Sequence, residues 1–303
     1  MRDEHQPEFP WLLDQPAETP FMEPRTARPP GISPVGGAAV LVQGPDFAAQ
    51  MAYRDRLIAE EAEAVLALDR DGEAPAAELY EEVIGMLSAA PGYACGAGVI
   101  ERPDGVAVDL DPSARMATLG RLVAEDLCLM VAAKDGRHRL VGAVLCFPSR
   151  WSLAEKMGYP LDVIHEPVPD YGDDLARRVE RLFGALRPER PLVRANWLIH
   201  GTAELFLPMH SGDKAPVSMD PQGRLYLRTE RQTLMRLPLT EAAVFLIRTQ
   251  VCPLTALSAD QAAALAREFG ALDADSVGYR AGADLYAHAM AELRVIAGQS
   301  PSA

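Results

Sequence analysis

Two short apolar runs joined by a tight turn constrain the fold of this chain more than any other feature. They cover residues 127–133 and 140–147, and the residues between them read Lys134-Asp135-Gly136-Arg137. Glycine in such a turn adopts positive φ at little steric cost, so the pair predicts an antiparallel β-hairpin. Both runs are far shorter than the ~20 residues that cross a bilayer, which predicts no membrane span.

Hydrophobic periodicity predicts the other elements. We expect helices over 47–68, 76–89, 173–186, 259–269 and 283–296, and strands near 192–199, 225–236 and 243–249. Asp46 is the expected N-cap of the first helix, and Ser152-Leu-Ala-Glu155 has the spacing of a capping box that begins a short helix. Hairpin-like strands flanked by helices, without a βαβ repeat, predict the α+β class with a mostly antiparallel sheet.

The composition changes along the chain in a way that predicts three parts. Residues 1–45 are rich in proline and are expected to form an extended arm with little helix. Residues 46–257 hold all the predicted strands and form the expected central domain. Residues 258–303 are expected to be a C-terminal helical region.

Charge and cysteine usage exclude several function classes. The formal net charge of −14 argues against a nucleic-acid partner, because phosphate binding needs concentrated Lys and Arg, whereas a cationic small substrate is not repelled. The four cysteines form no CxxC pair, which argues against an internal iron–sulfur cluster or structural zinc. No signal-peptide pattern is present at the N-terminus, so a cytoplasmic location is expected.

No dinucleotide-binding fingerprint is found in the chain. Gly96-Ala-Gly98 lacks the further glycine and the strand-to-helix setting that such a fingerprint requires. A reaction driven by NADPH therefore requires another subunit.

Two blocks have a composition that no ordinary core segment needs. Residues 146–171 read CFPSRWSLAEKMGYPLDVIHEPVPDY, and residues 225–238 read LYLRTERQTLMRLP. Shorter matching patterns are MAYRDRL, VAEDL, RANW and FLIRTQVCPL, which include Tyr53, Arg56 and Glu125-Asp126. Over roughly 46–257 the chain resembles the haem-dependent oxidative N-demethylase alpha-subunit family, whose members bind haem in a PAS-type domain and oxidise dimethylamine.

This resemblance implies a PAS-like core with haem b that oxidises a small, dimethylamine-like secondary amine with O2 and releases formaldehyde. It also implies a hetero-oligomer in which FMN, a [2Fe-2S] cluster and tetrahydrofolate reside on reductase and folate-binding partner subunits. Two alternatives remain open at this point. One is a haem-binding PAS-type gas or redox sensor without turnover, and the other is an alpha subunit that has lost haem.

Haem iron needs an axial ligand, and His165 is the first candidate. It lies between Ile164 and the proline-rich residues 166–169, which reduce the entropy cost of presenting an imidazole from a loop. His200 and His210 are alternatives, and Cys252 is a weaker one because a cysteine that ends an apolar strand is usually a buried neutral thiol. A structural histidine bonded to the backbone remains the competing interpretation of His165.

Haem propionates need cationic partners, for which the candidates are Arg150, Lys156 and Arg231. Arg228 and Arg231 are three residues apart, so strand alternation places them on opposite faces. Glu230 shares the face of Arg228, and these two are the candidate catalytic residues, with Glu230 holding the substrate ammonium. Ordinary surface charges or ion pairs are the alternative explanation.

Aromatic residues near the two blocks are candidates for lining a haem cavity or an electron path. Trp151 is the first of them, followed by Trp197, Tyr171 and Tyr226. Ordinary core packing is the alternative, because large aromatic rings are buried in most domains.

Overall fold

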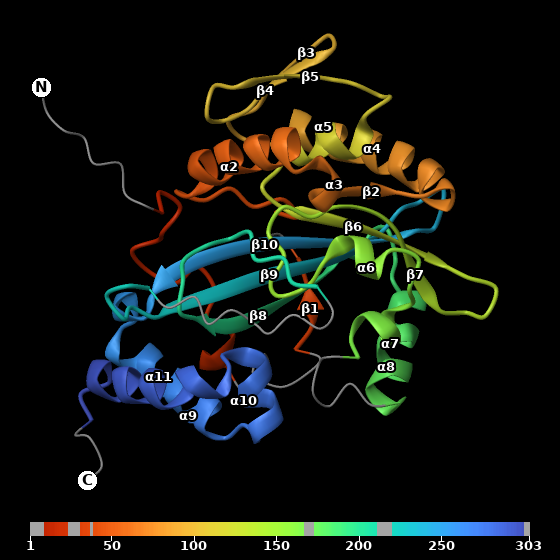
Figure 1. The fold of residues 1–303 in the computed structure, drawn as a ribbon. Helices are drawn as coiled ribbons and strands as arrows, with labels where there is room; N and C mark the ends of the chain where they lie inside the picture. Colours follow the sequence, from red (N-terminus) through yellow and green to blue (C-terminus); the bar gives the residue numbers. More distant parts are fainter. Residues whose placement is uncertain (1–8, 24–30, 37–38, 167–172, 211–219, 300–303) are drawn as a thin grey trace, which may run out of the picture.

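The computed structural model describes residues 9–23, 31–36, 39–166, 173–210 and 220–299 (Figure 1). Within these ranges the strands of the main sheet pair antiparallel in the order β1-β8-β9-β10-β6-β7-β2. The strands are β1 (Ser33–Pro34), β2 (Leu66–Leu68), β6 (Asp126–Ala132), β7 (His138–Val144), β8 (Leu192–His200), β9 (Tyr226–Arg236) and β10 (Ala243–Pro253). The predicted α+β class with an antiparallel sheet is confirmed.

The predicted hairpin is present as β6 and β7, and Gly136 in its turn has φ +82°. The last long strand, β10, pairs with β9 on one side and with β6 on the other. The hairpin and the later β8–β9–β10 meander are thereby joined into one sheet, which brings residues near 126 beside residues near 247.

Helices before the hairpin cover one side of the sheet (Figure 1). They are α2 (Phe47–Glu60), α3 (Ala62–Val65), α4 (Glu73–Ser88) and α5 (Arg115–Leu122). The prediction of one helix over 47–68 is wrong at its end, since Leu66 is extended and pairs with Val144 of β7. The unpaired edge of β7 offers backbone hydrogen bonds that end the helical pattern there.

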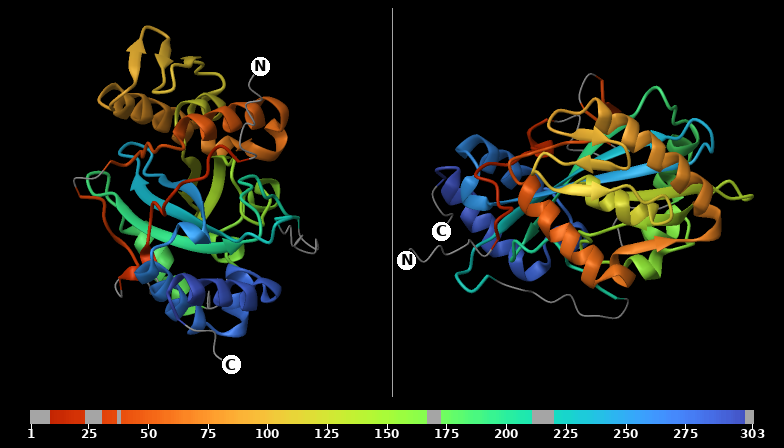
Figure 2. Two further views of the ribbon diagram at one scale, coloured as in Figure 1. Left: turned by 90° about the vertical axis from the view of Figure 1, so that its left-hand side faces the viewer. Right: turned by 90° about the horizontal axis from the view of Figure 1, so that it is seen from above.

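A small second sheet escaped prediction. It consists of β3 (Ala94–Gly96), β4 (Val99–Glu101) and β5 (Ala107–Asp109), and it stands outermost, above α4 and α5 (Figure 2). Its strands are three residues long and mostly exposed, so they carry no apolar periodicity that a sequence pattern detects.

Three short helices follow β7: α6 (Leu153–Lys156), α7 (Leu161–Ile164) and α8 (Asp173–Gly184). The chain ends in α9 (Ala259–Gly270), α10 (Ala274–Arg280) and α11 (Ala283–Ile296), of which α10 was not predicted. These C-terminal helices pack against Trp197, Ile199, Leu227 and Cys252 on the sheet.

The two predicted caps differ from expectation. Asp46 precedes α2, but its carboxylate makes no cap hydrogen bond and binds Arg248 at 2.8 Å instead. Ser152 precedes α6, again without a side-chain cap hydrogen bond. A buried guanidinium is a stronger partner for Asp46 than a backbone amide.

The described parts of the N-terminal arm lie against the domain. Trp11 is buried, stacks on Tyr53 with ring centroids 4.8 Å apart, and donates from Nε1 to the carbonyl of Ala203. Ser33 and Pro34 form β1 at the edge of β8. The boundaries at 45 and 257 remain predictions.

Among the described residues, no helix is both long and apolar enough to cross a membrane.

Candidate functional site

One face of the β8–β9–β10 meander carries an unusual set of polar side chains. Arg228 and Glu230 share this face on β9, as alternation requires. Asn196 of β8 and Thr249 of β10 pair with Glu230 from the two sides. Arg194 pairs with Gln232 and therefore lies on the same face.

The two candidate catalytic residues contact each other. Nε of Arg228 lies 3.3 Å from Oε1 of Glu230, and Nε2 of Gln232 donates to Oε2 at 3.1 Å. Arg228 is buried and also donates to the carbonyls of Phe147 at 2.6 Å and Leu205 at 3.2 Å. These contacts hold the carboxylate of Glu230 in one orientation.

The loop after β7 and helix α10 bring further guanidiniums to this region. Arg150 has φ +63°, a left-handed conformation that is costly for a residue other than glycine. It donates to the carbonyls of Tyr279 at 3.4 Å and Ala281 at 3.2 Å. Arg280 donates to Oδ1 of Asn196 at 3.1 Å and stacks on the ring of Trp197. The C-terminal helices therefore contribute to the site.

The site holds more positive than negative charge. Burial lowers the pKa of all four guanidiniums, those of Arg150, Arg194, Arg228 and Arg280. Nε of Arg194 is buried and has no hydrogen-bond partner within the described ranges. Buried polar groups are rarely left unpaired, so an unpaired guanidinium donor beside three others fits an anionic group such as a haem propionate.

The structure places His165 directly after α7. Its Nδ1 lies 2.8 Å from the carbonyl of Leu161, and this contact puts the proton on Nδ1. Burial is the main cause that lowers its pKa, and the charges of Arg194 and Lys156 lower it further. A neutral imidazole beside Arg194 fits an axial ligand of haem iron.

His200 lies on the Arg228 face at the end of β8. Burial, followed by the charges of Arg228 and Arg150, lowers its pKa well below the ordinary value, so this imidazole is neutral at pH 7. Its Nε2 lies 3.4 Å from Oγ of Ser149. His200 is therefore also in the site and remains the second candidate ligand.

The other two ligand candidates lie elsewhere. His210 is 65% exposed and lies 3.4 Å from the carboxylate of Glu155. Cys252 pairs with Leu227, on the opposite face from Arg228, and burial raises the pKa of its thiol to about 12. A neutral thiol packed against the C-terminal helices is not placed to bind a ligand on the Arg228 face.

The remaining predicted residues divide between the two faces. Arg231 lies on the opposite face, where it donates to Thr233 and to the carbonyl of Ala39 and pairs with Glu18 at 3.6 Å. Lys156 is the last residue of α6, and it lies near enough to His165 for its charge to lower the pKa of that imidazole. Trp151 packs at the edge of the hydrophobic cluster under α7 and α8.

Two predicted aromatic residues are also placed. Tyr226 is buried, with its hydroxyl bonded to Asp220 at 2.8 Å, and Trp197 lies under Arg280. Tyr171 and the prolines of residues 167–169 lie outside the described residues.

Sequence reasoning missed Arg194, Tyr279 and Arg280 as site residues. Arg194 was visible only as part of the RANW pattern, and its alternation with Asn196 was the available signal. Tyr279 and Arg280 belong to α10, whose seven residues carry too little periodicity to predict.

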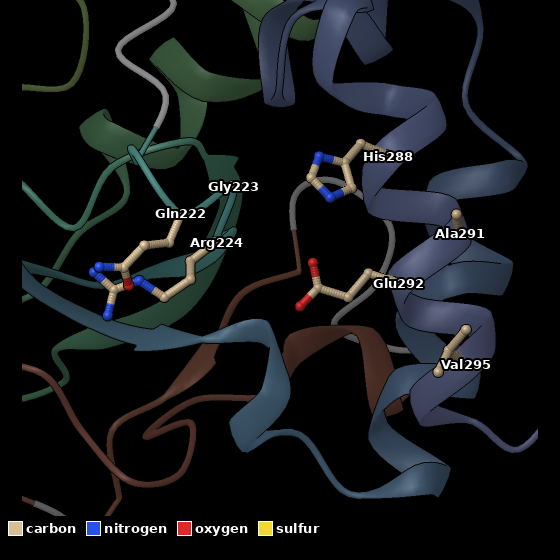
Figure 3. Close-up of a pocket in the computed structure, with 7 residues that line it drawn as sticks. All are labelled: Gln222, Gly223, Arg224, His288, Ala291, Glu292 and Val295. Atoms are coloured by element: carbon tan, nitrogen blue, oxygen red, sulfur yellow. The ribbon is translucent and has the colours of Figure 1, made fainter.

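A groove of about 430 Å³ lies away from these residues (Figure 3). It runs between the turn at 222–224 and α11, from which His288 and Glu292 project into it. None of the predicted site residues lines it. Within the described ranges, no group of three or more His, Cys, Asp and Glu side chains is arranged to hold a metal ion.

Residues 32–290 match the model of one protein family, described as haem-dependent oxidative N-demethylase, alpha subunit-like. The match covers most of the chain and extends beyond residues 46–257 in both directions, so it includes β1 and α10. A search of curated proteins finds no match.

Proposed function

This chain belongs to the haem-dependent oxidative N-demethylase, alpha subunit-like family, and on that premise we propose that it binds haem b on the Arg228 face and demethylates a small secondary amine such as dimethylamine. The observation that carries the proposal is the excess of guanidinium groups on this face, with Nε of Arg194 buried and unpaired among the described residues. Two propionates supply the negative charge that the face lacks.

The residues on this face divide into two roles toward haem. Arg194 and Arg150 are the proposed propionate partners, with Lys156 at the edge. His165 is the proposed axial ligand through Nε2, because its Nδ1 is already bonded to the carbonyl of Leu161. Arg231 was assigned to the propionates from the sequence, but its contacts with Thr233, Ala39 and Glu18 leave it out of this proposal.

Bound haem supplies the activation of O2 that the oxidation of an N-methyl group requires. Glu230 accepts the N–H of the substrate ammonium, and Arg228 and Gln232 keep its two oxygens fixed. This holds one N-methyl group in a constant position, which is the contribution of orientation to catalysis. The side chain of Glu230 is only 12% exposed, which limits the access of bulk water to the substrate ammonium.

Partner subunits complete the reaction in this proposal. The family description names an alpha subunit, which implies a multi-subunit enzyme. A reductase with FMN and a [2Fe-2S] cluster delivers electrons from NADPH, and a folate-binding subunit accepts formaldehyde. The cytoplasmic location and the PAS-like description of the core belong to the same proposal. The strand order β8-β9-β10-β6-β7 within the main sheet supports the PAS-like description.

A formaldehyde assay tests the proposal. We expect the haem-loaded chain with dimethylamine, O2, NADPH and an added reductase to release formaldehyde, and the same mixture without reductase to consume no NADPH. Haem binding and O2-dependent spectral changes without any formaldehyde would instead support a sensor. NADPH consumption by the isolated chain would contradict the assignment of electron delivery to a partner.

A further inference from the structure

The ion pair between Arg54 and Asp126 is fully buried and lies against the loop between β7 and α6, residues 145–152, which we call the site loop. Nη1 of Arg54 on α2 lies 2.6 Å from Oδ1 of Asp126 at the start of β6, and both side chains are 0% exposed. A buried ion pair often contributes less to stability than apolar residues of the same volume. Stability alone is therefore a weak reason for this pair, and its contacts with the backbone indicate another role.

Asp126 binds the main chain at the point where the site loop begins. Its Oδ1 accepts the N–H of Cys146 at 2.7 Å and its Oδ2 accepts that of Phe147 at 3.0 Å. Arg54 is itself held by the carbonyls of Gly120 at 3.0 Å and Glu125 at 2.9 Å. The pair thus fixes two consecutive peptide units from the side of the sheet that α2 covers.

The same loop segment, at Phe147, also contacts the arginines of the site. The carbonyl of Phe147 accepts from Nη2 of Arg228 at 2.6 Å, and Arg228 in turn contacts Glu230. Three residues later, the N–H of Arg150 bonds to the carbonyl of Leu207 at 2.8 Å. Hydrogen bonds therefore join Arg54 and Asp126 to Arg228 through Phe147, and Arg150 follows in the same segment of the backbone.

We propose that Arg54 and Asp126 are positioning residues that set the placement of Arg228 and Arg150 through the backbone of Cys146 and Phe147. The proposal rests on the proposed function for the identity of the ligand. An asparagine at position 126 has one acceptor oxygen and no negative charge, so it cannot accept strong hydrogen bonds from both N–H groups. The peptide unit of Phe147 is then held less firmly. Arg228 then loses a fixed acceptor, and Glu230 loses its fixed orientation.

The chain offers a matched control in a second buried pair. Asp46 and Arg248 lie 2.8 Å apart with 0% and 1% exposure, and they likewise join the α2 region to the sheet. Their other partners are Gln50, Gln250, Val42 and the carbonyl of Thr249, none of which belongs to the loop after β7. Loss of either pair costs stability, but only one pair holds the site loop.

The experiment compares Asp126→Asn with Asp46→Asn. We expect both to lower the melting temperature, while only Asp126→Asn speeds amide hydrogen exchange at Cys146 and Phe147 in the protein without haem. In the haem-loaded protein, Asp126→Asn should raise KM for dimethylamine about 10-fold with little change in kcat, as supporting contacts typically do. Arg54→Lys, which keeps the charge, should give a smaller KM effect and serves if Asp126→Asn does not fold.

Equal effects of the two aspartate variants on exchange and KM would overturn the positioning role. Faster exchange at Cys146 and Phe147 confined to Asp126→Asn, in a chain that binds no haem, would support the positioning of the loop while refuting the proposed function. If the wild-type chain oxidises amines but amide exchange at Cys146 and Phe147 is unchanged in Asp126→Asn, the positioning role is refuted and the proposed function stands.

Discussion

Arginines on the two faces of β9 are three residues apart and both buried, yet their surroundings differ. Arg231 donates hydrogen bonds to Thr233 and to the carbonyl of Ala39 and forms an ion pair with Glu18, so residues of the same chain satisfy its charge. On the face of Arg228, by contrast, Arg194 and Arg280 lie near the carboxylate of Glu230, and Arg150 lies near Arg228 itself. A buried cation with complete partners is structural, whereas an excess of buried and half-buried cations with an unpaired donor indicates a site for an anion.

The largest effect that separates the two faces is expected at His165. His165→Ala should weaken haem binding by about 100-fold, because it removes the iron ligand and leaves only the propionate contacts. The measurement is a haem titration followed by absorption, with His210→Ala as the control at an exposed position. An unchanged affinity in His165→Ala would move the ligand to His200.

The second test replaces one arginine on each face. Arg194→Gln should weaken haem binding about 10-fold, and it should leave the melting temperature of the haem-free protein unchanged or higher because it removes a buried N–H donor that has no partner among the described residues. Arg231→Gln should do the reverse, with a lower melting temperature and haem affinity within about 2-fold. Equal haem effects of the two variants would remove the distinction between the faces.

Glu230 tests the role of the single carboxylate. Glu230→Gln should raise KM for the amine about 10-fold, because a hydrogen bond to a charged group is lost, and should leave the haem spectrum unchanged. Steady-state formaldehyde release measures KM, and absorption checks the haem. A lowered kcat with unchanged KM would show that Glu230 does not hold the ammonium.

The pH dependence of stability should also report on the Arg228 face. Burial and the charges of Arg228 and Arg150 lower the pKa of His200, so the folded protein favours the neutral imidazole. This stability is complete above the unfolded pKa of ~6.5 and is lost as pH falls below it toward the folded value. Melting temperature should drop between pH 7.5 and 5, by ~2–4 °C per kcal/mol lost.

The histidine contribution to this drop is isolated by His200→Gln, which should reduce it. Burial also lowers the pKa of His165, so its contribution to the drop in melting temperature should persist in His200→Gln. Identical pH profiles for the two proteins would show that His200 is already protonated or exposed in the fold.

The smallest effect is expected on the opposite face. Cys252→Ser should leave the ferrous-CO spectrum unchanged, since Cys252 packs with Leu227 against the C-terminal helices. Loss of a strongly red-shifted band in this variant would reveal thiolate ligation, which imidazole ligation does not produce.

The sheet could be predicted from the sequence because its strands have strong local signals. The β6–β7 hairpin has two apolar runs and a glycine turn, and β8, β9 and β10 are nine to eleven residues long. The end of α2 was mispredicted because β2 forms by pairing with β7, a contact distant in sequence. Tertiary pairing overrode helix propensity there.

The site was only partly predictable for a related reason. Strand alternation correctly separated Arg228 from Arg231, but no pattern showed that Arg231 meets Glu18 of the N-terminal arm. Nor did any pattern indicate that α10 brings Arg280 to Asn196, 84 residues away in sequence. Partners that come from distant segments decide which charges are satisfied, and local sequence does not contain them.

Haem titration of the purified wild-type chain tests the central claim most directly. The account predicts saturation at about one haem per chain, a sharp Soret band, and a ferrous-CO spectrum typical of imidazole ligation. A protein that shows no Soret band at any haem concentration would contradict it.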